Sequence, residues 1–476
     1  MLKQKLKRST VPWMTGLVLA LCLSGCAVDQ AREVKLYREV LDGPDTAVVE
    51  SFHPEAPLTL AGAMTLANAH NERLAMSGEN YLQTLIDKDR AFAAFLPTIS
   101  FVPVFMRQDK TNLGAGNSLI SEFVKDKTTD VTVAGNMNLH PFRDVPAVRA
   151  AGSSVRMEKA LLLEQQSILM LDVARTYYQV MHAEAAVNVL ENAIEVDNRR
   201  LADIRVKQKA GTARPMDVSL AQAQLAETQN QLIQAQNDIS NGRAMLALLM
   251  GVVDISGPLV DGLDIPEDAG QFETLAKTAD AHRQDLLAAR EQVNIAAAAL
   301  EAAWGEYFPS VSLNLTSYLS RDSFPGDVDW TSLIRVNVPL FSAGLIHADV
   351  RSAYSRLRQA RLAEMYVQRQ VDKDLKTSLG DLSRDDRQIG QLEIRVKAAE
   401  DGLRQAEAAF KTGRGTYLEQ LTAREGLLSA RLALSDAGFN RCVDYLRLLY
   451  ATGTLTPDPY ENVLSGENGN HQSEDE

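Results

Sequence analysis

The segment Lys209-Ala210-Gly211-Thr212-Ala213-Arg214-Pro215-Met216-Asp217 decides the fold, because its pattern recurs 202 residues later as Lys411-Thr412-Gly413-Arg414-Gly415-Thr416-Tyr417-Leu418-Glu419. Small and apolar residues keep this offset without a gap as far as Gly251 and Gly453. A match of this length indicates a tandem duplication. Each copy is predicted to run helix, tight turn at the glycine, helix, with the glycine supplying a positive φ at the helix end.

The duplication continues toward the N-terminus, where prolines mark matching changes of pattern. Pro97 and Pro309 each precede an alternating segment, and Pro141 and Pro339 each follow the next alternating segment. We therefore interpret these four prolines as transitions between strand and helix. Each copy then reads helix, strand, loop, strand, very long helix, turn, helix.

Four short segments change from the helical period to a period of two, which is typical of half-buried strands. They are residues 98–106, which Pro103 interrupts, and residues 131–139, 311–316 and 336–338. Strands of nine or ten residues are near the length that a tilted transmembrane strand needs. One face is apolar and the other carries Asn, Thr and Ser, which fits lipid outside and a water-filled lumen inside. The alternative is two hairpins packed on a soluble core.

The remainder of each copy has the composition of long helices. A helical pattern runs from about 146 to 209 and from about 341 to 411, so each helix spans about 100 Å. The shorter helices, about 58–95 with 215–250 and 271–306 with 416–451, reach the same length when laid end to end. Each copy is therefore predicted to form two side-by-side rods, one continuous and one composed of two helices that meet near mid-length.

The N-terminus resembles a bacterial lipoprotein signal. Basic residues from Lys3 to Arg8 precede an apolar core at 11–23, and Leu23-Ser24-Gly25-Cys26 follows. The resemblance implies that Cys26 becomes the lipidated first residue, and Ala27 after it points to the outer membrane. The alternative is an ordinary secretory signal with an incidental cysteine.

Charge and motifs exclude several classes of function. The net charge is −13, and removal of residues 1–25, which hold four basic residues and no acid, lowers it to about −17. So acidic a chain is a poor candidate for nucleic-acid binding. The seven histidines are scattered, and the sequence contains no HExxH, no GxSxG and no phosphate-binding loop. We expect no enzymatic activity, no cofactor and no resident metal.

Four strands cannot close a barrel in a membrane, because an open edge leaves backbone groups without partners in lipid. Two copies would supply eight strands, which side chains fill, and three would supply twelve. A water-filled conduit therefore favours at least a trimer arranged about one axis. The expected fold class is mainly α, with long coiled-coil-like helices in an α-barrel and four strands contributing to a twelve-stranded β-barrel.

With these features in order, the chain resembles the TolC-like outer-membrane efflux protein family, in its lipidated branch. The features that carry the resemblance are the paired strand starts, the run Pro339-Leu340-Phe341-Ser342-Ala343-Gly344, and Lys-x-Gly followed six residues later by an acid, in both copies. The resemblance implies a homotrimer in the outer membrane that extends into the periplasm. Such proteins are exit ducts of tripartite efflux or type I secretion systems, working with a periplasmic adaptor and an inner-membrane transporter.

The resemblance also implies a gate at the periplasmic turns. Asp217 and Glu419 match acids that line the constriction of the family, where they would favour cations. The family often carries an arginine where this chain has Gly415; Arg414 lies one residue early, and Arg214 in the other turn is a candidate substitute. Gly211, Gly413 and Gly415 mark the tips where an adaptor would dock. The alternative is that both acids only stabilise helix N-termini.

The chain is accordingly divided into a signal peptide (1–25), a lipidated extended tether (26–57), a first repeat (58–252, with a hairpin at 98–140 and a turn at Gly211), a linker (253–270), a second repeat (271–455, with a hairpin at 310–340 and a turn at Gly413) and a disordered tail (456–476). A periplasmic coiled-coil lipoprotein with a structural or adaptor role is the alternative function. The substrate stays open among drugs, metals, polysaccharides and proteins, because selection in such systems lies mainly with the transporter.

Overall fold

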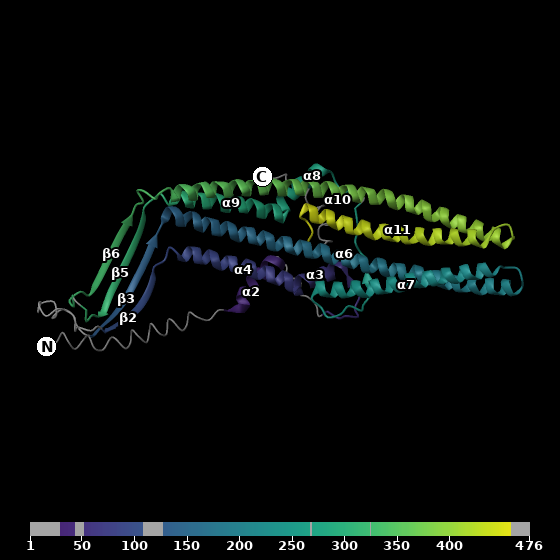
Figure 1. Cartoon of the computed structure of the whole chain (residues 1–476), viewed down its shortest axis with the longest axis horizontal. Helices are drawn as coiled ribbons and strands as arrows, with labels where there is room; N and C mark the ends of the chain where they lie inside the picture. Colours follow the sequence, from purple (N-terminus) through teal and green to yellow (C-terminus); the bar gives the residue numbers. More distant parts are fainter. Residues whose placement is uncertain (1–28, 43–51, 108–126, 267–268, 324, 458–476) are drawn as a thin grey trace, which may run out of the picture.

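The computed structural model describes residues 29–42, 52–107, 127–266, 269–323 and 325–457. They form an elongated helical body with one antiparallel sheet at one end (Figure 1). Two helices dominate the body, α6 (Pro141–Lys209) with 69 residues and α10 (Leu345–Lys411) with 67 residues. At ~1.5 Å per residue each is about 100 Å long. The predicted mainly α fold with very long helices is confirmed.

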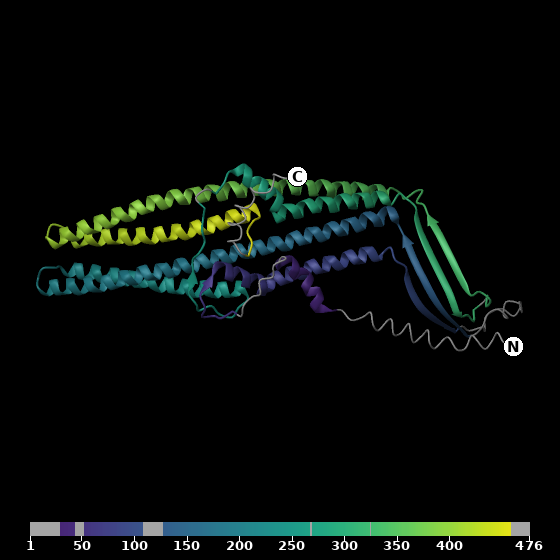
Figure 2. The same cartoon turned by 180° about the vertical axis from the view of Figure 1, so that it is seen from behind.

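Shorter helices lie beside the two long ones. At the end far from the sheet, α7 (Pro215–Met250) folds back on α6, and α11 (Tyr417–Thr452) folds back on α10 (Figures 1 and 2). Nearer the sheet, α4 (Glu72–Ala93) packs on α6, and α9 (Gln284–Gly305) packs between α6 and α10. None of the described helices combines the length and the apolar composition needed to cross a bilayer.

The two helices that precede the sheet are each broken, which the sequence did not predict. The expected helix at 58–95 is α3 (Leu60–His70) followed by α4, and the expected helix at 271–306 is α8 (Phe272–His282) followed by α9. Asn71 and Arg283 stand at the breaks with ψ of 121° and 115°. The Asn71 amide donates to the carbonyl of Leu249 at 2.9 Å. Arg283 donates to the carbonyl of Ala451 at 3.4 Å. Each break is thus stabilised by a bond to the end of α7 or α11.

The prediction of an extended tether over 26–57 is wrong for part of that range. Residues Gln30–Asp42 form the helix α2, which packs on α4 and α6 and buries Tyr37 and Leu41. The Arg38 guanidinium donates to the carbonyls of Asn68 and Ala69 at 2.7 and 2.8 Å. These carbonyls end α3, so α2 is bound to the body by both apolar and polar contacts.

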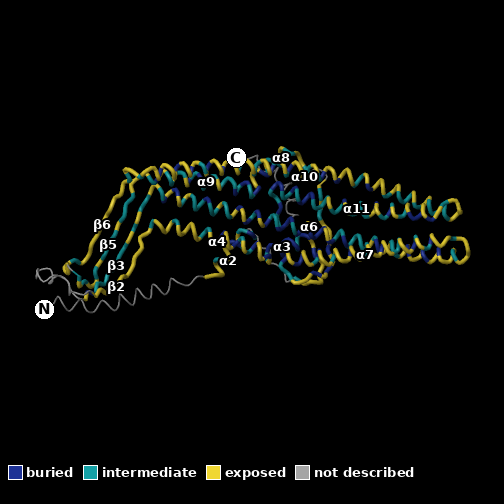
Figure 3. The backbone as a smooth tube through the Cα atoms, in the orientation of Figure 1, coloured by how far each residue is buried: buried dark blue, intermediate teal, exposed yellow. Residues whose placement is uncertain are grey.

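The core lies midway along the body, where the ends of α3 and α7 meet against α6 (Figure 3). Tyr177 of α6 is fully buried there, between two short parallel strands, β1 (Leu58–Thr59) and β4 (Leu259–Val260). Its hydroxyl donates to the Leu58 carbonyl at 2.7 Å and accepts from the Val260 N–H at 3.0 Å. The predicted linker therefore supplies a strand that holds the two halves of a rod together.

The sheet has the order β2-β3-β5-β6 and is antiparallel throughout. Its strands are β2 (Thr98–Arg107), β3 (Lys127–Leu139), β5 (Ser310–Ser320) and β6 (Trp330–Asn337). The central contact joins β3 of the first copy to β5 of the second. The duplicated hairpins thus form one continuous sheet, with β2 and β6 as its two edges.

The register gives the sheet one continuous apolar face. Residues directly opposite each other share a face, and Met137 opposes Leu313, which in turn opposes Ile334. On the other face, Asn136 opposes Asn314. The apolar face is exposed in the single chain and includes Ile99, Phe101, Phe105, Leu313, Leu315, Ile334 and Val336. The predicted alternation of apolar and polar faces is therefore present on β3 and β5. It is incomplete on the two edge strands, because Val102, Val104 and Met106 of β2 and Leu333 of β6 lie on the face of the asparagines.

Parts of the sequence predictions fall outside the described residues. These are the signal peptide, Cys26, most of the connection between the two strands of the hairpin predicted at 98–140 and most of the C-terminal tail.

Candidate functional site at the helical tips

The turn between α6 and α7 holds residues 210–214 and reverses the chain at Gly211, whose φ is +73°. The Gly211 N–H donates to the Gln208 carbonyl at 3.0 Å, and the Thr212 N–H donates to the Lys207 carbonyl at 2.9 Å. A Cβ on Gly211 would meet nothing within 4 Å. Glycine is therefore favoured here by the left-handed backbone alone.

The turn between α10 and α11 is built on the same plan, with Gly413 at a φ of +72°. The N–H groups of Arg414 and Gly415 both donate to the Ala409 carbonyl, at 2.9 and 3.0 Å. A Cβ on Gly415 would lie 3.0 Å from the Cβ of Ala409 and 3.2 Å from Oε2 of Glu419. The turn is thus packed tightly around Gly415, where any larger residue would require its neighbours to shift by a few tenths of an ångström.

Asp217 is the third residue of α7 and caps it. Its Oδ2 accepts from the Arg214 N–H at 3.0 Å, and its Oδ1 accepts from Nη2 of Arg214 at 2.9 Å. Asp217 is only 8% exposed. The hydrogen bond from the Arg214 side chain, which outweighs burial, holds the pKa of Asp217 below its usual value. In this chain Arg214 therefore pairs with the acid of its own turn.

Glu419 occupies the same position in α11, but it is exposed. Its Oε2 accepts from the Thr416 N–H at 2.8 Å, and its own N–H donates to Oγ1 of Thr416 at 3.2 Å. Such a reciprocal pair is a capping box. Both acids thus stabilise a helix N-terminus, as the alternative interpretation expected. Arg414, at the tip of this turn, is exposed.

Behind the turns, the two helical hairpins share a small apolar core. Tyr417 of α11 is buried against Leu201 and Ile204 of α6 and Ala221 of α7. Its ring centroid lies 6.0 Å from that of Phe410. The tips of the two hairpins are therefore in direct contact within one chain.

Charged side chains also join the two hairpins, and no pattern in the sequence pointed to them. Arg424 of α11 pairs with Asp197 of α6 at 2.9 Å and donates to the Ala193 carbonyl at 2.8 Å. The other oxygen of Asp197 accepts from Thr228 of α7 at 3.1 Å. Arg200 of α6 pairs with Glu407 of α10. On a helical wheel these residues look like ordinary solvated charges, so only their partners identify them as ties.

The other predicted site residues lie as follows. Pro97 and Pro309 immediately precede β2 and β5, Pro141 is the first residue of α6, and Pro339 lies between β6 and α10. Among the residues that the structure describes, no group of three or more His, Cys, Asp or Glu side chains is arranged to hold a metal ion.

Comparisons with known proteins agree on one family. The family model described as outer membrane efflux protein matches residues 83–252 and again residues 275–454. The outer membrane efflux protein BepC of Brucella suis biovar 1 (strain 1330) is 23% identical over 415 residues, which cover 84% of this chain and 86% of BepC. The outer membrane protein TolC of Escherichia coli (strain K12) is 20% identical, over 84% of this chain and 85% of TolC.

The fold is also that of a solved channel. A crystal structure of CusC superposes with a TM-score of 0.74 at 19% identity and covers 84% of this chain and 93% of the CusC chain. At this level of identity the likeness concerns the fold. It places the long paired helices and the four-stranded sheet in one known architecture.

Proposed function

The chain belongs to the outer membrane efflux protein family, and from this premise we propose that three copies form one continuous duct from the periplasm to the exterior. Members of the family are outer-membrane channels of tripartite efflux systems, and this chain is an exit duct of that kind, which lies in the outer membrane and extends into the periplasm. The proposal concerns the way in which this chain builds the duct.

The four-stranded sheet is the observation that carries the proposal. Its apolar face is exposed on β2, β5 and β6 and partly exposed on β3, while its opposite face presents Asn136, Asn314 and Thr316. Among the residues that the structure describes, the edge strands β2 and β6 have no neighbour on their outer sides. In lipid such edges must be paired. Pairing β6 of each copy with β2 of the next closes twelve strands and turns the polar face into a lumen.

The helical body extends the same ring below the membrane. The long helix α6 begins directly after β3, and α10 follows β6 after a short connection, so each copy continues from the barrel into a rod about 100 Å long. Three copies would therefore line one tunnel whose far end is formed by the turns at Gly211 and Gly413.

The tips supply the proposed gate and the docking point. The two acids differ in availability, since Asp217 is buried and paired with Arg214 whereas Glu419 is exposed. We assign the larger share of cation preference to Glu419, with Asp217 contributing once Arg214 leaves it. Arg414, next to Gly413, is available to link neighbouring copies. The exposed turns, including Gly415, are the proposed contact of a periplasmic adaptor.

The partners are proposed by class. The family works with periplasmic adaptors and inner-membrane transporters. We propose that this chain has one partner of each class and that the transporter supplies the energy, because channels of this family are conduits and not enzymes. Lipidation of Cys26 would add an anchor in the membrane that the barrel already spans. Cys26→Ala should abolish incorporation of labelled palmitate, and persisting label would contradict the lipid site.

Single-channel recording of the purified protein in a planar bilayer, with native mass spectrometry of the same sample, tests the duct. We expect three copies per particle and small, uniform, cation-selective events. Both Glu419→Gln and Asp217→Asn keep the size of the side chain and remove its charge. Glu419→Gln should lower the cation preference more, because Glu419 is exposed whereas Asp217 is paired with Arg214. Particles of one copy, or well-folded trimers that stay silent after the turn residues 210–214 and 412–416 are shortened, would contradict the proposal.

A further inference from the structure

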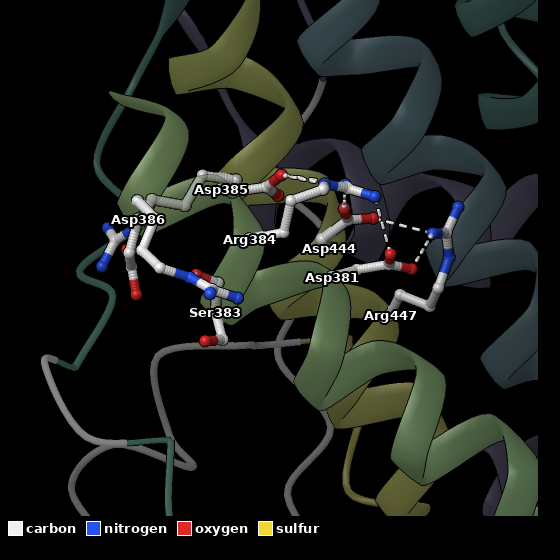
Figure 4. Close-up of polar contacts among 9 residues, drawn as sticks. Asp381, Ser383, Arg384, Asp385, Asp386, Asp444 and Arg447 are labelled. Atoms are coloured by element: carbon white, nitrogen blue, oxygen red, sulfur yellow. Dashed lines mark hydrogen bonds and ion pairs between the residues drawn. The ribbon is translucent and has the colours of Figure 1, made fainter. Parts of the chain in front are cut away.

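A cluster of five charged side chains joins α10 to α11 (Figure 4). Arg384 of α10 reaches Oδ1 of Asp385 at 2.8 Å and Oδ2 of Asp444 in α11 at 3.2 Å. It also pairs with Asp381 at 2.7 Å. Arg447 of α11 pairs with Asp444 at 2.7 Å and approaches Asp381 at 3.9 Å. Three carboxyl groups thus face two guanidinium groups.

Two of these carboxyl groups are buried. Asp385 is 3% exposed and Asp444 is 6% exposed. Oδ2 of Asp385 is buried and has no hydrogen-bond partner, although Oδ1 accepts from Arg384. Burial of such an oxygen destabilises the folded state, because the atom loses its hydrogen bonds to water and forms none within the protein. The site therefore lacks one donor and carries one negative charge too many.

The neighbouring side chains in the described part of the chain do not supply that donor. On the same two helices, Arg441 is already paired with Asp386 at 2.6 Å. From α6, Arg175 and His182 line the same groove as Asp444. Arg175 pairs with Asp172 at 3.4 Å, and His182 lies 3.7 Å from Asp436. From α8, the buried Ala279 packs in one apolar cluster with Tyr445 and Leu448 of α11, and an alanine side chain has no hydrogen-bond donor.

We propose that Asp385 and Asp444 share one proton, so that the pair acts as a pH-sensitive clamp between α10 and α11. A proton taken from solvent by the Asp444 carboxylate gives an O–H group that donates to Oδ2 of Asp385. The same proton makes the cluster of three carboxyl groups and two guanidinium groups neutral. When the proton leaves, two buried carboxylates face each other and the clamp is weakened.

The acid–base properties of Asp444 agree with this arrangement. Burial raises the pKa of Asp444 to about 6, and the Asp385 carboxylate adds to the shift because it favours the protonated form as a hydrogen-bond donor. A carboxyl group whose pKa is higher in the folded state binds its proton more tightly there than when unfolded. Its contribution is therefore stabilising at pH 5 and is lost as the pH rises through 6, which is opposite to the usual behaviour of a salt-bridged aspartate.

Hydrogen exchange of residues 436–452 in the full-length protein in detergent, corrected for the intrinsic effect of pH, tests the clamp. We expect the local opening constant to rise roughly tenfold between pH 5 and pH 8 in the parent protein, as follows from a folded pKa near 6 and an unfolded value near 3.8. Asp444→Asn places an amide donor beside Asp385 permanently. It should abolish the rise and leave α11 at pH 8 at least as protected as in the parent.

Two further variants keep the test decisive. Asp385→Asn removes the other half of the pair and should abolish the same rise. Asp386→Asn changes the neighbouring, half-exposed carboxylate and should retain it. The parent should also show the infrared band of a protonated carboxyl group at pH 5 and lose it at pH 8. A flat exchange profile in the parent, a tenfold rise that survives in both pair variants, or absence of the infrared band would overturn the proposal.

Discussion

Gly453→Ala is the substitution that best separates backbone strain from tertiary fit in this fold. Gly453 follows α11 with a φ of +74°, and Gly413, at the tip of the other end of the same helix, has a φ of +72°. An alanine at either position adopts a left-handed conformation at a cost of about 1–2 kcal/mol. The two sites differ only in what surrounds them, so Gly413→Ala is a matched control.

The surroundings of Gly453 are backbone atoms. A Cβ there would lie 2.6 Å from the carbonyl carbon of His282 and 2.7 Å from the nitrogen of Arg283, whereas a Cβ on Gly413 would meet nothing within 4 Å. Backbone atoms at the α8–α9 break cannot rotate away as the end of a side chain can. Overpacking of this kind adds about 1–3 kcal/mol. We expect Gly453→Ala to cost about 2–5 kcal/mol in local stability and Gly413→Ala about 1–2 kcal/mol.

Global melting is a poor assay for this difference, because 1 kcal/mol moves the midpoint of a chain of this length by only about 1 °C. Hydrogen exchange of residues 445–455 reads the junction directly. The additional cost corresponds to a loss of protection of about 5- to 150-fold relative to the effect of Gly413→Ala at its own turn. The first copy provides a replicate, since a Cβ on Gly251 would lie 2.5 Å from the His70 carbonyl oxygen. Equal losses at the tip and at the junction would refute the reasoning.

Three further predictions concern buried polar groups and the tips. Arg283→Ala should destabilise the body by about 3–5 kcal/mol, because Arg283 is 3% exposed and its loss removes the ion pair of Asp285, the bond to the Ala451 carbonyl and one of the two partners of Asp374, which keeps Lys373. Arg290→Ala, which removes a partly exposed pair with Asp280, should cost less than about 1 kcal/mol in the same denaturation series. Tyr450→Phe should lower the free energy of unfolding by about 1–3 kcal/mol in the same denaturation series. It removes the 2.5 Å hydrogen bond that the phenol donates to the buried Glu164 carboxyl group. An unchanged stability would show that water replaces the hydroxyl. Acidification should lower the hydrogen-exchange protection of the amides at 214–220, because the pKa of Asp217 is depressed in the folded state. The contribution of Asp217 to stability is complete above the unfolded pKa of 3.8 and disappears as the pH falls below that value. Asp217→Asn should abolish this dependence on pH.

Much of the architecture could be predicted because it is encoded by local, repeated patterns. The offset between Gly211 and Gly413 identifies the duplication, and the alternation from 131 to 139 identifies a strand. The prolines at 97 and 309 stand directly before strands. Side-chain periodicity and backbone conformation are properties of neighbouring residues, so they are visible without any knowledge of the fold.

The candidate site could be predicted only in part, because local patterns show where its residues lie along the chain but not what they contact in the fold. The sequence located Asp217 and Glu419 at the tips, but their equal spacing concealed a difference in burial. Asp217 is buried beside Arg214, and Glu419 is exposed. The ties that join the hairpins, such as the pair of Arg424 and Asp197, come from residues more than two hundred positions apart. No local pattern selects such a pair from the many charges of a long helix.

By itself, the sequence determined the duplicated plan, the change from helix to strand at fixed places, and the turns at the far ends, because each depends on residues a few positions apart. The tertiary structure decided where that plan is interrupted and which charges are buried. Asn71 and Arg283 have neither the ring of proline nor the freedom of glycine, and they break their helices because the ends of α7 and α11 offer them carbonyl groups. Asp385 of α10 and Asp444 of α11 become a buried pair only when the two helices pack together, because each carboxyl group is removed from water by the surface of the other helix.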